Sequence, residues 1–134
     1  MKRKAFNSLE AAKRLVEMRE TCGYNSSVHC SYYAVLQYMK YKLANCEENP
    51  LPYDKQNDKK NGSSHEFILN EIKQRINNPY KAKGFMEKVR NLKKYRVEAD
   101  YTQRDFTEEE SLECKEQAEQ AIKKLNQYFV RHEK

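Results

Sequence analysis

The chain has 134 residues, a formal net charge of +6 at pH 7 and a charged-residue content of 34%. This length suffices for one hydrophobic core, so we expect a single domain over residues 1–134. Only 3 Gly and 3 Pro occur. Because the reversals of a sheet usually need such turn residues, the composition favours long helices and an all-α fold.

The residue pattern does not indicate a metal site, a disulfide framework or a membrane segment. The four cysteines form no CxxC pair, and the three histidines stand far apart at positions 29, 65 and 132. We therefore expect no metal site and no cofactor. The sequence has no run of about 18 apolar residues and no apolar stretch typical of a signal peptide. These features predict a cytoplasmic protein with reduced thiols and no membrane contact.

The first predicted helix covers residues of about 8–20. Asn7 stands three residues before Glu10, which is the spacing of a capping box, and apolar residues follow at helical intervals. Gly23 then predicts a break in the chain, because glycine is a weak helix former.

A second helix is expected over about 26–46, with Asn25 or Ser26 as its cap. Its apolar residues form one continuous stripe, which makes it the clearest helix of the chain. Residues 46–64 hold two of the three prolines, a glycine and many polar residues. Such a segment buries little surface, so we expect a mobile loop.

The third and fourth helices are predicted over about 65–77 and 82–98. Ser63 and Glu66 have the capping-box spacing before the third, and the stop is expected near Pro79. The apolar residues of the fourth recur at helical intervals.

A fifth helix is predicted over about 107–131, where Thr107 and Glu110 form another capping-box pattern. Apart from 46–64, the connections are short, and short connections make consecutive helices antiparallel neighbours. The sequence therefore predicts an antiparallel up-and-down bundle of four to five helices.

Basic residues crowd the fourth helix. Seven cations occupy the sixteen residues from position 81 to 96, in which Glu87 is the only acid. Such a run attracts phosphate. The alternative is a solvated helix face that balances the acidic start of the fifth helix at 108–113. The candidate RNA- or phosphate-binding residues are Arg90, Lys93, Lys94 and Arg96.

Arg96 ends this basic run four residues before Asp100, so an intact helix lets the two side chains meet. Either the ion pair stabilises the end of the helix, or Asp100 holds the planar guanidinium of Arg96 in position to bind a phosphate group. Arg96 is also the one candidate for a catalytic residue, and Asp100 and Tyr101 are supporting candidates.

Four polar or aromatic residues are expected on one flank of the second helix, because they follow one another at spacings of four, four and three. They are His29, Tyr33, Gln37 and Lys40. Either this flank faces a ligand or partner, or it is an ordinary amphipathic boundary whose tyrosine rings cover the edge of the core. The ten tyrosines likewise indicate either base stacking or core packing.

Three short motifs, in this order, resemble signatures of the HEPN domain: Tyr32-Tyr33-Ala34, Ser64-His65, and Arg96 with Asp100-Tyr101. The resemblance spans about residues 8–130. It implies an antiparallel helical bundle, commonly a homodimer, that is often encoded beside a minimal nucleotidyltransferase in prokaryotic toxin–antitoxin or defence systems.

Nuclease members of the family carry an Arg followed, after four to six residues, by a His, and the pair cleaves RNA without metal. Arg96 matches the Arg, but Tyr101, Thr102 and Gln103 occupy the three positions at which the His is expected. A tyrosine with an ordinary pKa near 10 is a poor general base at neutral pH. The resemblance therefore implies the fold and a role for Arg96, without the nuclease mechanism.

Three functions remain open from the sequence. The first is a non-catalytic module that binds RNA, a nucleotide or a partner protein through residues 90–101. The second is a ribonuclease, such as a toxin, in which His29 or His65 reaches Arg96 through space or Tyr101 replaces the missing base. The third is a structural adaptor that pairs with itself or with a nucleotidyltransferase through the Tyr33 flank.

Overall fold

The computed structural model describes residues 1–57 and 64–129. Within these ranges the chain is all-α, with no strand, as the composition predicts. The helices are α1 (Lys2–Glu17), α2 (Thr21–Asn45), α3 (Ser64–Gln74), α4 (Pro79–Tyr101) and α5 (Glu108–Tyr128), with one 3-10 turn, η1 (Tyr53–Lys55).

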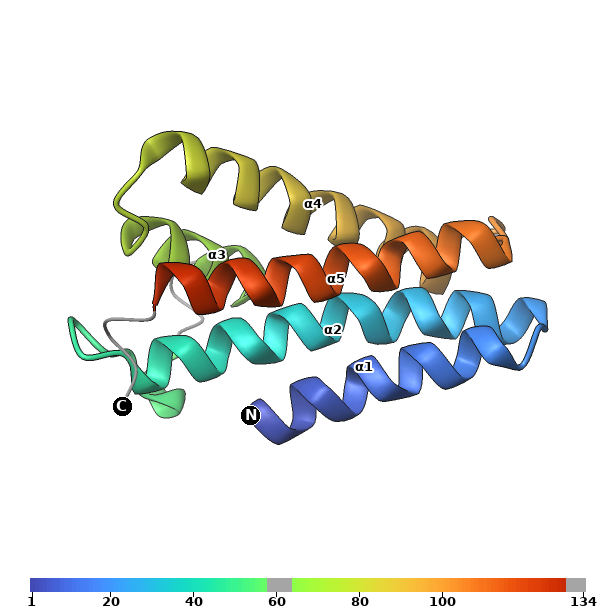
Figure 1. The fold of residues 1–134 in the computed structure, drawn as a ribbon, viewed down its shortest axis with the longest axis horizontal. Coiled ribbons are helices and arrows are strands. Elements are labelled where there is room, and N and C mark those ends of the chain that lie inside the picture. The colour runs from blue at the N-terminus through green and yellow to red at the C-terminus, as the bar shows by residue number, and fades with distance from the viewer. Residues whose placement is uncertain (58–63, 130–134) are drawn as a thin grey trace.

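The four long helices run alternately up and down, and α3 is a short helix at one end of the bundle (Figure 1). Helix α2 packs against all the other helices. Its fully buried side chains, among them Val28, Tyr32, Val35, Met39 and Leu43, form the middle of the core. Each such side chain contributes about 1.5–3 kcal/mol when it leaves water. The predicted antiparallel bundle is confirmed.

Helix α1 begins at Lys2, six residues before the predicted start, and its N-cap is Met1. The proposed capping box of Asn7 and Glu10 is therefore wrong, because both residues lie inside the helix. Ala5 explains the early start, since it is fully buried and extends the apolar stripe by one turn toward the N-terminus.

The break between α1 and α2 falls at Arg19, whose φ of 55° is left-handed, and Gly23 lies within α2. The predicted break at Gly23 is therefore wrong. A Cβ atom at this position would stand 2.5 Å from the carbonyl oxygen of Leu15. The glycine is thus required because α1 and α2 approach closely, not because the helix ends there.

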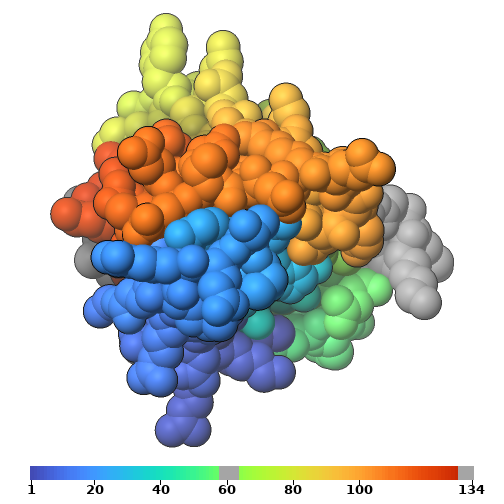
Figure 2. All heavy atoms as spheres, turned by 90° about the vertical axis from the view of Figure 1, so that its right-hand side faces the viewer, coloured from blue at the N-terminus to red at the C-terminus, as the bar shows by residue number. Residues whose placement is uncertain are grey.

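Asn25 caps no helix, contrary to the prediction, because α2 starts at Thr21. Its side-chain oxygen accepts a hydrogen bond from the Phe106 N–H at 2.9 Å, and its amide donates to Asp105 at 3.3 Å. Asn25 therefore joins the N-terminal part of α2 to the α4–α5 connection at one end of the bundle. Figure 2 views the molecule from this end.

Most of the residues from 46 to 57 after α2 are exposed, but one side chain in this segment is anchored in the bundle. Gln56 is buried, and its amide donates to the carbonyl oxygens of Lys40 at 2.9 Å and Leu51 at 2.8 Å. The mobility of residues 46–57 stays a prediction, and the η1 turn and the contacts of Gln56 are local structure that the sequence did not indicate. The rest of that segment, including Ser63 of the predicted capping box, lies outside the described residues.

Helix α4 starts three residues earlier than predicted and ends three residues later. Asn78 caps it, because its side chain accepts from the N–H groups of Tyr80 and Lys81, and Pro79 fits the first turn. The longer C-terminal end keeps Arg96, Asp100 and Tyr101 on one continuous helix.

Helices α3 and α5 differ from the prediction at their ends. Helix α3 runs over 64–74 instead of 65–77. Helix α5 ends at Tyr128, and the predicted extension beyond residue 129 lies outside the described residues. The capping box of Thr107 and Glu110 is confirmed, with hydrogen bonds of 3.0 and 3.1 Å.

Candidate functional site

Seven side chains from three helices meet on the face of the bundle where α4 crosses α2 and α3. We call them the Arg96 cluster: His29, Tyr32 and Tyr33 from α2, His65 from α3, and Arg96, Asp100 and Tyr101 from α4. All seven residues stand out in the sequence, Tyr32 only as part of the Tyr32-Tyr33-Ala34 motif.

Arg96 is the centre of the cluster. Its side chain is only 9% exposed, and its Cζ atom lies 5.5 Å from the ring centres of Tyr32 and Tyr33 and 5.8 Å from that of Tyr101. These distances permit cation–π attraction. Burial follows from the helical period, since Arg96 stands four residues after Leu92 on the stripe that faces α2.

The guanidinium of Arg96 makes no hydrogen bond to any residue that the structure describes. Its Nε atom is buried without a partner. The nearest carboxylate oxygen, Oδ2 of Asp100, lies 3.6 Å from a terminal nitrogen, which is beyond hydrogen-bond distance. The predicted approach of Arg96 and Asp100 is confirmed, but it leaves the donors of Arg96 unsatisfied.

His29 approaches the same carboxylate from α2. Its Nδ1 donates a hydrogen bond of 2.7 Å to Oδ2 of Asp100, because a carboxylate can only accept. The ring packs on Tyr33 with 4.6 Å between ring centres and is 44% exposed. With the proton on Nδ1, the Nε2 atom of a neutral His29 is an acceptor. Asp100 thus orients His29 beside Arg96, as in other carboxylate–histidine pairs.

His65 occupies the other side of Tyr32, and its Nδ1 lies 3.1 Å from the Tyr32 hydroxyl. Burial, followed by the nearby charges of Lys93, Arg96 and Lys40, lowers the pKa of His65 to about 4. Burial also raises the pKa of Tyr32 above its usual value. Both groups are therefore neutral at pH 7, and His65 is a weak base.

The basic residues of α4 differ in how far their charge is already balanced. Arg90 donates to Glu66 of α3 at 2.6 Å. Lys94 is exposed and Lys93 is half-buried, and neither forms an ion pair within the part of the chain that the structure describes. Together with Val97 and Glu98, these three cations line an open hollow along α4.

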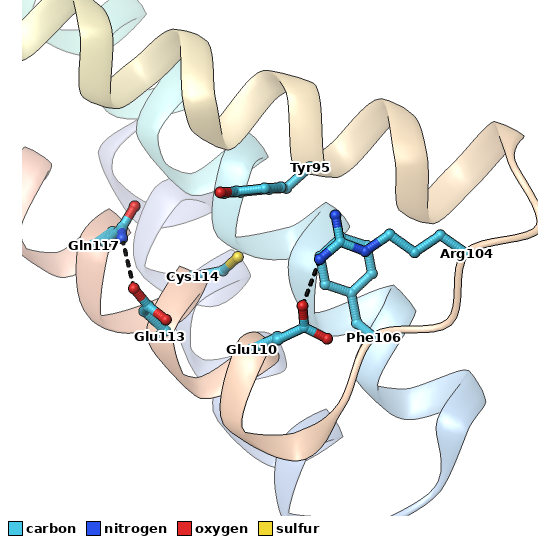
Figure 3. A pocket seen from close by; sticks show the side chains of 7 residues that line it. All are labelled: Tyr95, Arg104, Phe106, Glu110, Glu113, Cys114 and Gln117. Carbon is cyan, nitrogen blue, oxygen red and sulfur yellow. Dashed lines mark hydrogen bonds and ion pairs between the residues drawn. The ribbon is translucent and has the colours of Figure 1, made fainter.

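A second arginine cluster lies where α4 passes into α5 (Figure 3). The guanidinium of Arg104 stacks on Phe106, with 4.2 Å from Cζ to the ring centre, and lies 5.5 Å from Tyr95. Arg104 also pairs with Glu98 of α4 and Glu110 of α5. We call these five residues the Arg104 cluster.

The two ion pairs of the Arg104 cluster compensate the charge of its only cation, because two carboxylates face one guanidinium. The hydrogen bond to Glu98 raises the pKa of Arg104 further. The hydrogen bond from the Thr107 backbone, followed by that from Arg104, lowers the pKa of Glu110. The adjoining cavity is small, about 60 Å³, and burial raises the pKa of the Cys114 thiol at its wall to about 11. We assign this cluster a structural role.

Two further features of the described residues concern metal binding and membrane spans. Among the described residues, no group of three or more His, Cys, Asp or Glu side chains is placed to hold a metal ion. In the same residues, no helix combines the length and the apolar character needed to cross a membrane.

The sequence matches the HEPN domain over residues 1–128, nearly its whole length. The chain belongs to the HEPN family. HEPN domains are generally RNA-binding or nuclease modules, and they often form dimers. Comparison with curated proteins and with solved structures gave no match. The resemblance inferred from the three short motifs is thus confirmed.

Proposed function

We propose that this HEPN domain binds RNA and holds a backbone phosphate at Arg96. The observation that carries the proposal is the buried guanidinium of Arg96, which has no hydrogen-bond acceptor among the described residues. Burying a charge without hydrogen bonds costs free energy. A phosphate group offers two oxygens in the plane of the guanidinium, so it would satisfy donors that the protein leaves open.

The surroundings of Arg96 suit an RNA strand. Asp100 orients the guanidinium without saturating it, at 3.6 Å. The exposed ring of Tyr101, 75% accessible, offers a face on which an unpaired base can stack. Lys93 and Lys94 provide positive charge for the neighbouring phosphates. Arg90 contributes less in this view, because Glu66 already compensates its charge.

The direct test measures binding of a fluorescent single-stranded RNA by anisotropy at several salt concentrations. Arg96→Ala should weaken binding about 10- to 100-fold, because hydrogen bonds to charged groups contribute about 1.5–3 kcal/mol. Lys94→Gln should weaken it less and reduce the slope of log K against log salt by about 1. Unchanged affinity in both variants would refute the proposal.

A matched control distinguishes RNA binding at the basic face of α4 from nonspecific attraction by the positive charge of the protein. Lys4 and Lys13 are exposed on α1, on the opposite side of the bundle from α4 (Figure 1). Reversing both should change RNA affinity much less than reversing Arg90 and Lys94. If the two double reversals have equal effects, binding is delocalised and the basic helix has no special role.

A metal-independent ribonuclease is the second candidate, and the contact between His29 and Asp100 favours it. His29 is the better placed base, since Asp100 leaves its Nε2 atom as an acceptor, whereas the pKa of His65 of about 4 makes that imidazole a weak base. In this mechanism Nε2 of His29 takes the proton of a ribose hydroxyl, and Arg96 stabilises the charge that develops on the phosphate.

Cleavage of a mixed single-stranded RNA in the presence of a chelator tests this candidate. Wild-type protein should cut, while His29→Gln and Arg96→Ala should both lose activity, by at least about 100-fold. His65→Gln should retain it. No cleavage by folded wild-type protein would leave the binding function alone.

The homodimer, the nucleotidyltransferase partner and the toxin–antitoxin or defence context stay predictions, as does an adaptor role. The Tyr33 ring contacts both His29 and Arg96, so Tyr33→Glu would disturb RNA binding and any interface together. Light scattering of wild type and Arg96→Ala separates the two roles. A change in mass with Arg96→Ala would support an adaptor interface at this cluster.

A further inference from the structure

A groove lies between α3 and α4, and the proposed phosphate site at Arg96 lies outside it. It holds about 540 Å³ of open space, which lies within the usual range for ligand sites. Its lining combines buried apolar side chains with three cations and one acid: Ile76, Met86, Lys73, Lys83, Arg90 and Glu87. The groove is therefore an apolar trough with a positively charged rim.

The groove continues into the basic surface beside Arg96. Arg90 lines both the groove and the hollow that contains Lys93, Lys94 and Val97. The ion pair between Arg90 and Glu66 spans α3 and α4 between the two hollows. Glu66 is the neighbour of His65, which belongs to the Arg96 cluster. Two hollows that share Arg90 thus lie along α4 between Lys83 and Glu98, and their cations outnumber the two acids, Glu87 and Glu98, that also line them.

We propose that the α3–α4 groove is a second subsite for the same single-stranded RNA, which takes a nucleotide several positions away from the phosphate at Arg96. This inference rests on the proposed function. Lys73 and Lys83 stand on opposite helices of the groove and reach a phosphate, while the side chains of Ile76 and Met86 form an apolar floor for the base.

The spacing sets the minimum length of the RNA. Lys83 and Arg96 are thirteen residues apart on one helix, which at about 1.5 Å per residue is roughly 20 Å. A stacked strand advances about 3.4 Å per nucleotide, so about six nucleotides connect the two subsites. An RNA of three nucleotides fills only the Arg96 subsite, whereas one of nine reaches both.

The test is a length series of labelled single-stranded RNAs of three, six, nine and twelve nucleotides, measured by anisotropy at low salt. The double variant Lys73→Glu/Lys83→Glu should lose at least about tenfold in affinity for nine nucleotides and less than about twofold for three. Lys4→Glu/Lys13→Glu carries the same change in charge on α1 and should not distinguish the two lengths. Circular dichroism confirms that both variants are folded.

Each other result overturns the inference. Equal losses at every length would mean general electrostatics, and unchanged binding at every length would mean that RNA does not enter the groove. If RNA binding is unchanged but the variant no longer binds an acidic amphipathic helical peptide, the groove serves a protein partner instead. If the wild-type protein binds no RNA, the proposed function is refuted as well. If Arg96→Ala loses RNA affinity but Lys73→Glu/Lys83→Glu does not, only the groove subsite is refuted.

Discussion

Arg96 and Arg104 stand eight residues apart, and both stack on aromatic rings, yet their surroundings are opposite. Arg104 is 38% exposed and pairs with two carboxylates. Arg96 is 9% exposed, has one carboxylate at 3.6 Å and makes no hydrogen bond within the described residues. The more buried guanidinium is therefore the less satisfied one.

This difference separates a structural arginine from one prepared for a ligand. Arg104 ties the end of α4 to the start of α5, and its donors are used within the protein. The aromatic contacts of Arg96 hold the side chain in place but supply no hydrogen-bond acceptor, so its N–H groups have no hydrogen-bond partner among the described residues. Functional sites commonly retain such unfavourable arrangements at a cost in stability.

RNA affinity should separate the two arginines most strongly. Arg96→Met should reduce affinity for a nine-nucleotide RNA about 10- to 100-fold, because charge-assisted hydrogen bonds worth about 1.5–3 kcal/mol are lost. Arg104→Met, which removes the same charge nearby, should change affinity less than about threefold. Anisotropy titrations of both variants side by side measure this, and equal losses would erase the distinction between the clusters.

Thermal stability should be affected in the reverse order, more by Arg104→Met than by Arg96→Met. Arg104→Met removes exposed ion pairs and a cation–π contact, so the free energy of unfolding should fall by about 1 kcal/mol and Tm by about 3–5 °C. Arg96→Met replaces a buried unsatisfied cation by an apolar side chain, so Tm should stay constant or rise. Thermal denaturation tests both. A larger loss with Arg96→Met would make Arg96 a structural residue.

The titration of His65 reports on the charge of Arg96. Burial and the charges of Lys93, Arg96 and Lys40 together lower the pKa of His65 to about 4. The Arg96→Met variant should therefore raise the pKa of His65 toward its usual value, while Arg104→Met leaves it unchanged. NMR titration of the imidazole measures the two variants, and a constant pKa in both would mean that the charge of Arg96 does not reach His65.

A further expected effect is on the acid dependence of stability. The pKa of His65 is about 4 in the folded protein and near 6.5 in an unfolded chain. Between these values the unfolded chain binds a proton that the folded one excludes, so stability falls as pH decreases from 6.5 to 4. His65→Gln should make this decline shallower. Parallel declines in urea titrations of the two proteins would contradict the low pKa.

Local signals predicted most of the fold, and they failed where distant segments compete. Thr107 caps α5 as predicted because both partners of its capping box lie within four residues. Asn25 has the same intrinsic preference for a cap, but it bonds to residues 105 and 106 instead. A sequence pattern cannot reveal such a partner about 80 residues away, because only the packed bundle brings the two segments together.

The site was predictable in part for the same reason. Arg96 and Asp100 are one helical turn apart, so their approach follows from spacing. The contact of His29 with Asp100 joins two helices, and only their packing reveals it. One missed signal was available: Arg96 continues the apolar stripe of Val89 and Leu92 at helical spacing, which predicts burial of a charged side chain.

The hydrogen bonds of Asn25 also constrain how this chain can vary. Asn25 lies one turn before His29 on α2, and its partners at 105 and 106 follow Asp100 closely. The same few bonds therefore fix the register in which His29 meets Asp100. Insertions or deletions between residues 101 and 107 would shift that register, so we expect relatives that keep the His29–Asp100 pair to keep the length of this connection as well.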